Sequence, residues 1–175
     1  MVTWRLLNTE PRDGAWNMAV DEVLWRGVQK GTSPPTIRFF AWDPPTLSLG
    51  YGQSVKRDLD MEALERFGIP LVRRPTGGRA VFHDMELTYS IVFPEGLWTR
   101  NPVDNFLPSL VRSPLPSSPP VPPNVPILRD YAAISLSLAA GLRYLGVEAT
   151  LASSAYRVNP RDRSGSCFSS TSAFE

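Results

Sequence analysis

The 175-residue sequence has few of the residues that form cross-links and metal sites. Cys167 is the only cysteine, so no disulfide can form within the chain, and His83 is the only histidine, which argues against a classical zinc site. Lysine occurs only at Lys30 and Lys56, and the formal net charge is +1. This near-balance argues against a nucleic-acid-binding protein that relies on bulk positive charge.

Long apolar runs are also missing. No stretch approaches the ~20 apolar residues that a membrane-spanning helix needs, and the N-terminal residues lack the apolar core of a secretory signal. We therefore expect a cytoplasmic protein with a free thiol and no membrane partner.

Proline, in contrast, is abundant in one segment. Nine of the 18 prolines fall between Pro102 and Pro126, a density that excludes both helix and sheet. We expect a single domain over residues 1–175, with a proline-rich loop inserted at about 101–126.

The rest of the chain alternates between helical and strand patterns. A helix is predicted from a cap at Asp13 to a stop at Gly31, with an apolar stripe formed by Trp16, Ala19, Val20, Val23 and Leu24. Further helices are predicted over residues 60–67 and 129–145. Strands are predicted over residues 4–7, 36–41, 46–49, 71–74, 80–83, 87–93 and 147–151. Because regular βαβ alternation is not apparent, the pattern indicates a mixed sheet of the α+β or α/β class.

The densest cluster of unusual residues is the segment 73–84, in which Thr-Gly-Gly lies between arginines. One interpretation is a β-hairpin whose turn uses the Gly-Gly pair. The other is a binding loop that brings backbone N–H groups and guanidinium groups to an acyl or phosphate group. The two interpretations are compatible.

Two residues are candidates for chemistry. His83 and Asp84 are adjacent in a predicted strand and point to opposite faces, so Asp84 is poorly placed to orient His83 as in a triad. We favour a structural or substrate-contacting histidine over a general base. Cys167 is either an inert buried thiol or, given its Ser-, Gly- and Arg-rich surroundings, an exposed nucleophile.

Several motifs in the same order resemble one known family. They are Asp13–Glu22, the stretch 35–51, Arg73–Asp84 and Glu86–Ser90. Together they resemble the lipoate–protein ligase A and octanoyltransferase family, whose α+β catalytic domain is shared with biotin–protein ligases. The Thr-Gly-Gly-Arg and Glu-Leu-Thr-Tyr-Ser forms resemble the LipM-type octanoyltransferases. ATP-dependent lipoate ligases typically have a third glycine where Arg79 stands.

The resemblance implies a transferase that needs no ATP, other cofactor or metal. It would move an octanoyl group from acyl carrier protein to a lysine of a lipoyl domain, typically the glycine-cleavage H protein. Cys167 would be the catalytic nucleophile and would carry the acyl group as a thioester. The substrate-binding residues would be Arg73, Arg74, Thr76, Gly77, Gly78, Arg79, Ala80, His83 and Asp84. The candidate walls of the acyl tunnel would be Leu49, Tyr51 and Val81.

The family also has a lysine that lowers the pKa of the nucleophilic thiol, at a position beyond Glu175. An unassisted thiol with a pKa of ~8.5 is only about 3% thiolate at neutral pH. We therefore expect a catalytic domain that is incomplete at its C-terminus and inactive or poorly folded as it stands. The alternatives are an ATP-dependent lipoate ligase and a non-catalytic module that binds a lipoyl domain or a carrier protein.

Overall fold

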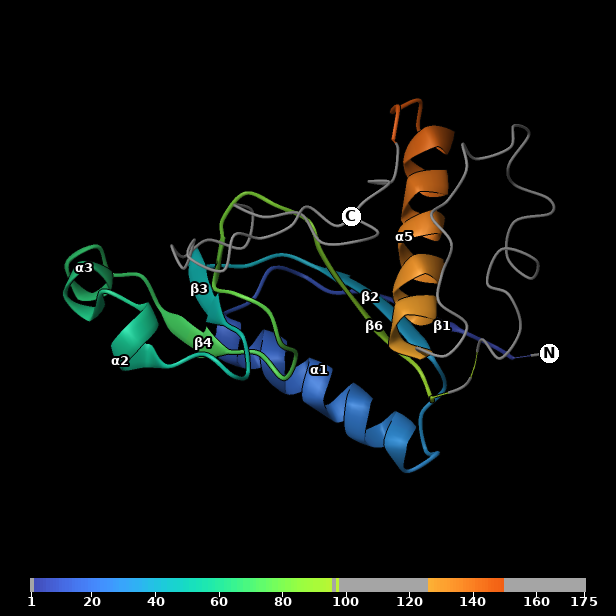
Figure 1. Cartoon of the computed structure of the whole chain (residues 1–175), viewed down its shortest axis with the longest axis horizontal. Coiled ribbons are helices and arrows are strands. Elements are labelled where there is room, and N and C mark those ends of the chain that lie inside the picture. The colour runs from blue at the N-terminus through green and yellow to red at the C-terminus, as the bar shows by residue number, and fades with distance from the viewer. Residues whose placement is uncertain (1, 96, 98–125, 150–175) are drawn as a thin grey trace. The chain divides into compact units, whose positions relative to one another are not determined.

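The computed structural model describes residues 2–95, 97 and 126–149 (Figure 1). The chain divides into two compact units, and all described residues up to Glu95 belong to the first. The elements of the first unit are β1 (Arg5–Asn8), α1 (Gly14–Gln29), β2 (Thr36–Phe40), β3 (Thr46–Leu49), α2 (Val55–Asp58), α3 (Met61–Arg66), β4 (Leu71–Arg73), β5 (Val81–His83) and β6 (Thr88–Val92). The second unit contains α5 (Pro126–Tyr144).

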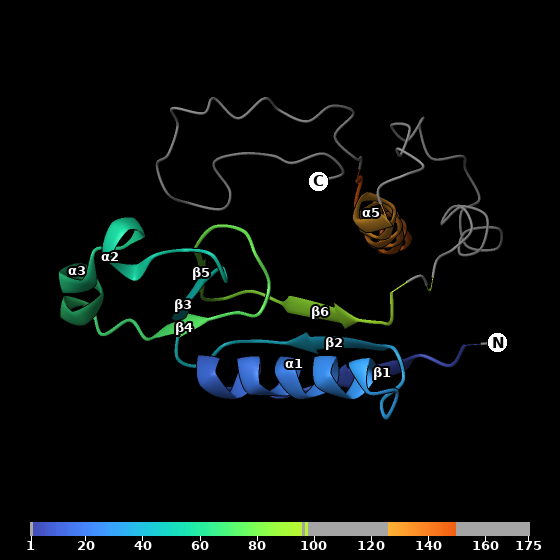
Figure 2. The ribbon, with the colours of Figure 1, turned by 60° about the horizontal axis from the view of Figure 1, so that its bottom comes forward.

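The strands of the first unit form two three-stranded sheets with the orders β1-β2-β6 and β4-β3-β5. In each sheet the central strand has one parallel and one antiparallel neighbour. Helix α1 connects the parallel strands β1 and β2, and the short helices α2 and α3 connect β3 and β4 (Figure 2). The mixed α+β class is confirmed, although the two parallel crossovers were not apparent from the sequence.

The segment 71–83 does not form the hairpin that its Gly-Gly pair permits. β4 and β5 lie on opposite sides of β3, where Leu47 pairs with Leu71 and Thr46 pairs with His83. Two strand spacings of roughly 4.8 Å separate β4 from β5, which is too far for a two-residue turn. The residues between them therefore form a loop that passes from one edge of this sheet to the other.

Helix α1 begins where the sequence predicts, but it buries a different face. The Asp13 side chain accepts a hydrogen bond from the Trp16 backbone N–H (2.9 Å), as an N-cap should. Of the predicted apolar stripe only Leu24 is buried, whereas Val23 is 69% exposed. The buried positions are Gly14, Asn17, Leu24 and Val28.

The polar part of this face contacts a buried arginine in β2. Arg38 is fully buried and donates to Asp21 Oδ1 (2.8 Å) and Asn17 Oδ1 (2.6 Å), while its guanidinium lies 4.0 Å from the centroid of the Phe40 ring. Ser90 of β6 also donates to Asp21 Oδ1 (2.8 Å). These bonds join α1, β2 and β6 around a polar centre that a search for apolar stripes cannot detect.

Helix α2 was not predicted from the sequence, whereas α3, α5 and the strands of the first unit lie close to their predicted positions. Asp60 caps α3 by accepting from the Ala63 N–H, and α5 begins a few residues before the predicted start. Residues 147–149 form no strand. No helix in the described part of the chain is both long and apolar enough to cross a membrane. Residues 101–125 of the proline-rich segment and Cys167 lie outside the described residues.

Candidate active site

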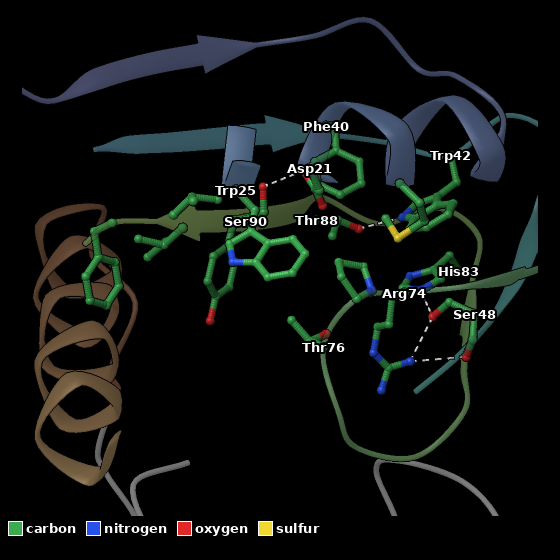
Figure 3. Close-up of a pocket in the computed structure, with 16 residues that line it drawn as sticks. Asp21, Trp25, Phe40, Trp42, Ser48, Arg74, Thr76, His83, Thr88 and Ser90 are labelled. Carbon is green, nitrogen blue, oxygen red and sulfur yellow. Dashed lines mark hydrogen bonds between the residues drawn. The ribbon is translucent and has the colours of Figure 1, made fainter. Parts of the chain in front are cut away.

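The first unit contains a cavity of about 410 Å³ (Figure 3). This volume lies within the roughly 300–1,000 Å³ range of small-molecule sites. The lining residues come from α1, β2, the connection between β2 and β3, β3, the segment from Arg74 to His83, and β6 with the residue after it. They are Met18, Asp21, Trp25, Phe40, Trp42, Ser48, Arg74, Pro75, Thr76, His83, Thr88, Tyr89, Ser90, Ile91, Val92 and Phe93.

The cavity is mainly apolar, and one of its ends is polar. Figure 3 shows Ser48, Arg74 and His83 together at this polar end. Asp21 and Ser90 line the wall nearer Trp25, where they are hydrogen-bonded to each other. An elongated ligand with one polar end would match this distribution, because its apolar part leaves water while its polar end finds hydrogen-bond partners.

His83 is held by contacts on three sides. Its Nε2 lies 2.7 Å from Ser48 Oγ, its Nδ1 lies 2.6 Å from Glu86 Oε1, and its ring stacks on Trp42 with centroids 4.0 Å apart. Ser48 and His83 come together because the pairing of Thr46 with His83 makes them diagonal neighbours on one face of the sheet. As expected, Asp84 does not orient His83. Glu86 lies there instead, three residues from His83, and the sequence analysis missed it.

The two adjacent arginines hold different loops. Arg73 Nη1 donates to the carbonyl oxygens of Gly50, Tyr51 and Gln53 at 2.9–3.0 Å. Arg74 reaches the cavity, where Nη1 donates to Ser48 Oγ (3.0 Å) and Nη2 donates to the carbonyls of Gly77 (2.9 Å) and Arg79 (2.5 Å). Only Arg74 of this pair lines the cavity.

The Gly-Gly loop packs closely on the end of β3. A Cβ atom placed on Gly50 would lie 2.0 Å from the carbonyl oxygen of Gly78, and Gly78 itself has a φ of +88°. Both positions therefore require glycine. Sequence reasoning found Gly78 but missed Gly50, because its constraint comes from a residue far along the chain.

The predicted site residues divide into two groups. Arg74, Thr76 and His83 line the cavity, whereas Arg73, Gly77, Gly78, Arg79, Ala80 and Asp84 do not. The expected tunnel walls Leu49, Tyr51 and Val81 are also absent from the lining. Leu49 is 1% exposed and Tyr51 is 73% exposed. The apolar lining comes instead from α1, β2 and β6.

The resolved pKa shifts belong to a pair distant in sequence from the cavity residues. The pKa of Asp58 is lowered, first by a hydrogen bond from Arg57 and then by one from the Ser54 backbone N–H. Arg57 has a raised pKa for the reciprocal reason. Among the described residues, histidine and carboxylate side chains form no group of three or more that could hold a metal ion.

A mixed α+β unit with an apolar cavity and a polar end has the features typical of a small-molecule-binding domain. Comparison with known proteins gives the family. A model described as the lipoyl protein ligase A/B catalytic domain matches residues 13–108. The chain belongs to that family.

Comparison with individual relatives supports the same family. The chain is 42% identical to an octanoyltransferase LipM of Kyrpidia tusciae, with 100% of this chain and 57% of the relative covered. It is 40% identical to an octanoyltransferase LipM of Moorella thermoacetica, over 99% of this chain and 55% of the relative. The chain thus spans a little over half the length of these curated relatives.

A solved structure of a candidate lipoate protein ligase from T. acidophilum is also similar. It has a TM-score of 0.62 and 27% identity, with 86% of this chain and 51% of that chain covered. This likeness supports the α+β fold of the family's catalytic domain.

Proposed function

We propose that the chain provides the acyl-binding part of an octanoyltransferase in lipoate biosynthesis. The observation that carries this proposal is the apolar cavity with Ser48, Arg74 and His83 at its polar end, in a member of this family. An octanoyl chain would lie along the apolar wall formed by α1, β2 and β6. Its thioester carbonyl would lie near the polar end.

The proposed chemistry is two-step acyl transfer through Cys167. The thiolate attacks the carbonyl carbon of octanoyl-acyl carrier protein, a new thioester forms, and the carrier thiolate leaves. A lysine amine of a lipoyl domain then attacks the Cys167 thioester. This forms the amide and breaks the C–S bond, and the proton lost from the amine restores the Cys167 thiol. The glycine-cleavage H protein is our proposed acceptor, and the cytoplasm is our proposed location.

The binding loop has a supporting role in this proposal. Arg74, Thr76 and His83 would contact the acyl group directly, because they line the cavity. Arg73, Gly77, Gly78, Arg79, Ala80 and Asp84 would shape the segment that carries them. The hydrogen bonds of Arg74 to the carbonyls of Gly77 and Arg79 support this division.

The direct test is formation of an acyl adduct. The 175-residue chain is incubated with octanoyl-acyl carrier protein at about pH 9, where even an unassisted thiol is largely ionised. At this pH intact mass should show one octanoyl group, and peptide mapping should place it on Cys167; an adduct together with turnover would overturn the expectation of an inactive chain. The Cys167→Ala variant should show none. An adduct on another residue, or no adduct under these conditions, would contradict the proposed nucleophile.

The same assay separates the alternatives. An ATP-dependent ligase would activate octanoate or lipoate only with ATP and would be indifferent to Cys167→Ala. A non-catalytic module would bind the carrier or the lipoyl domain and form no adduct. Octanoyltransferase chemistry requires transfer from the carrier without ATP, and Arg79 in place of the ligases' third glycine favours it.

A further inference from the structure

A continuous series of hydrogen bonds leads from the polar end of the cavity to Glu86. Arg74 Nη1 is 3.0 Å from Ser48 Oγ, and Ser48 Oγ is 2.7 Å from His83 Nε2. His83 Nδ1 is 2.6 Å from Glu86 Oε1. The same carboxylate oxygen accepts from Thr88 Oγ1 (2.6 Å), which itself accepts from Trp42 Nε1 (2.7 Å).

The chemistry of the two ends fixes the direction of these bonds. Arginine and tryptophan can only donate, and an ionised carboxylate can only accept. Trp42 therefore donates to Thr88, and the Thr88 hydroxyl donates to Glu86. By the same rule, Nδ1 of His83 carries a proton and donates to Glu86. Arg74 donates to Ser48, which leaves only the bond between Ser48 and His83 to be assigned.

Burial decides that last assignment. Ser48 is fully buried, and within the described part of the chain its Oγ has two hydrogen-bond partners, Arg74 and His83. If His83 is neutral, the Ser48 hydroxyl donates to Nε2 and every polar hydrogen in the series is satisfied. If Nε2 carries a proton, Nε2 donates instead and no group in the described part of the chain accepts the Ser48 hydroxyl hydrogen, which costs free energy in a buried site.

We propose that Glu86 is a positioning residue that holds His83 in the neutral Nδ1–H tautomer. That tautomer makes Nε2 an acceptor for Ser48, and the lone pairs of Ser48 then accept from Arg74. Arg74 in turn holds the carbonyls of Gly77 and Arg79. A carboxylate outside the cavity lining is thus linked through His83 and Ser48 to the guanidinium, which also donates to the Ser48 carbonyl oxygen (3.2 Å). That the ligand is an acyl group rests on the proposed function. The arrangement of the hydrogen bonds does not depend on it.

The arrangement of Ser48, His83 and Glu86 also has the order of a nucleophilic triad. Three observations favour positioning over nucleophilic attack. The Ser48 side chain is fully buried, and its Oγ already accepts a hydrogen bond from Arg74. Ser48 also lies within strand β3 rather than on an exposed turn. An acyl group attached to Ser48 is therefore an outcome that the test must be able to detect.

The chain allows a direct spectroscopic test because His83 is its only histidine. With ¹⁵N-labelled histidine, the spectrum at about pH 8 reports the protonation of each ring nitrogen of that one residue. We expect a protonated Nδ1 and an unprotonated Nε2. In the unmodified chain, either an imidazolium or a neutral ring with its proton on Nε2 would overturn the proposal.

Variants at Glu86 separate positioning from packing. In Glu86→Ala the acceptor is gone, so the Nε2–H tautomer should appear. In Glu86→Gln an amide oxygen can still accept from Nδ1, so the original tautomer should return. Glu62→Gln, at an exposed carboxylate of α3, is the matched control and should leave the spectrum unchanged. An unaltered spectrum in Glu86→Ala, or no recovery in Glu86→Gln, contradicts the role assigned to Glu86.

Binding of octanoate tests the consequence for the cavity. Because a charge-assisted contact at the polar end depends on the position of Arg74, Glu86→Ala should weaken octanoate binding by about tenfold in calorimetry. Equal affinity in both proteins would overturn the positioning role, as would labelling of Ser48 by a fluorophosphonate. If octanoate binds neither protein while the tautomer results hold, the proposed function fails and the network remains.

Discussion

At the scale of single residues, the buried polar groups matter most. Arg38 is enclosed by Asp21, Asn17 and Phe40, whereas Arg26 forms an exposed ion pair with Glu22 one turn away on α1. The two arginines therefore form a natural pair for measuring how burial changes the value of an ion pair.

Replacing Arg38 should be far more costly than replacing Arg26. Arg38→Ala leaves Asp21 partly buried without its cation, and we expect a loss of about 3–5 kcal/mol in the free energy of unfolding. Arg26→Ala removes a solvent-screened pair and should cost at most about 0.5 kcal/mol. Urea denaturation followed by circular dichroism measures both. Similar losses in the two variants would show that the buried ion pair of Arg38 stabilises the fold no more than the exposed pair of Arg26.

A second feature at the scale of single residues is the requirement for glycine at position 50. A Cβ on Gly50 would meet the carbonyl oxygen of Gly78 at 2.0 Å, so Gly50→Ala must displace the binding loop. We expect a loss of about 1–3 kcal/mol in stability. Gly52→Ala is the control, because a Cβ there has no atom within 4 Å. Thermal unfolding of both variants should show a lower Tm for Gly50→Ala alone.

At the scale of elements, the orientation of α1 is the main correction to the sequence analysis. The pattern of apolar residues placed Val23 and Leu24 on the same buried stripe, but Leu24 is 6% exposed and Val23 is 69% exposed. The helix is rotated so that Asn17 and Asp21 meet Arg38. Hydrogen bonds to a buried charge outweigh the burial of one further valine.

This rotation predicts opposite outcomes for neighbouring substitutions. Leu24→Ala removes a buried side chain and should cost about 2–5 kcal/mol. Val23→Ala removes an exposed one and should change stability by less than about 0.5 kcal/mol. Chemical denaturation of the two variants compares them directly. A large loss in Val23→Ala with little effect in Leu24→Ala would restore the face that the sequence pattern indicates.

At the scale of the whole molecule, the first unit is organised around two central strands. β2 is paired on both sides by β1 and β6, and β3 is paired on both sides by β4 and β5. The Arg38 network lies beside β2, while the network of Ser48, His83 and Glu86 begins in β3. Each polar network is therefore anchored on the strand that is most fully hydrogen-bonded in its sheet.

Hydrogen exchange should reveal this organisation. Amides of β2 and β3 should exchange most slowly among the described strands, because opening them disrupts pairing on both sides. Amides of β1, β4 and β5 that face away from their partner should exchange earlier. Residue-resolved exchange by NMR on the intact chain is the measurement. Uniformly fast exchange would show that the 175-residue chain does not hold this fold.

Much of the fold and of the family could be predicted from the sequence because the signals are local. Asp13 and Asp60 cap helices through backbone groups three residues away, and strand segments follow from short β-rich runs. Four motifs in the same order, Asp13–Glu22, 35–51, Arg73–Asp84 and Glu86–Ser90, together indicated the family, which the comparisons confirm. The roles proposed for Cys167 and for the individual binding residues remain predictions.

Other features depended on the tertiary structure because their partners are distant in sequence. Ser48 and His83 are 35 positions apart, and Asp21 and Ser90 are 69 apart. Strand order decided that β4 and β5 are not a hairpin, and that Gly50 approaches Gly78. The scarcity of histidine, evident from the sequence, argued against a classical zinc site. Only the tertiary structure determined which groups surround the single imidazole: the pairing of β3 with β5 brings Ser48 to it, and Trp42 stacks on its ring. A hydrogen-bond partner depends on position in space.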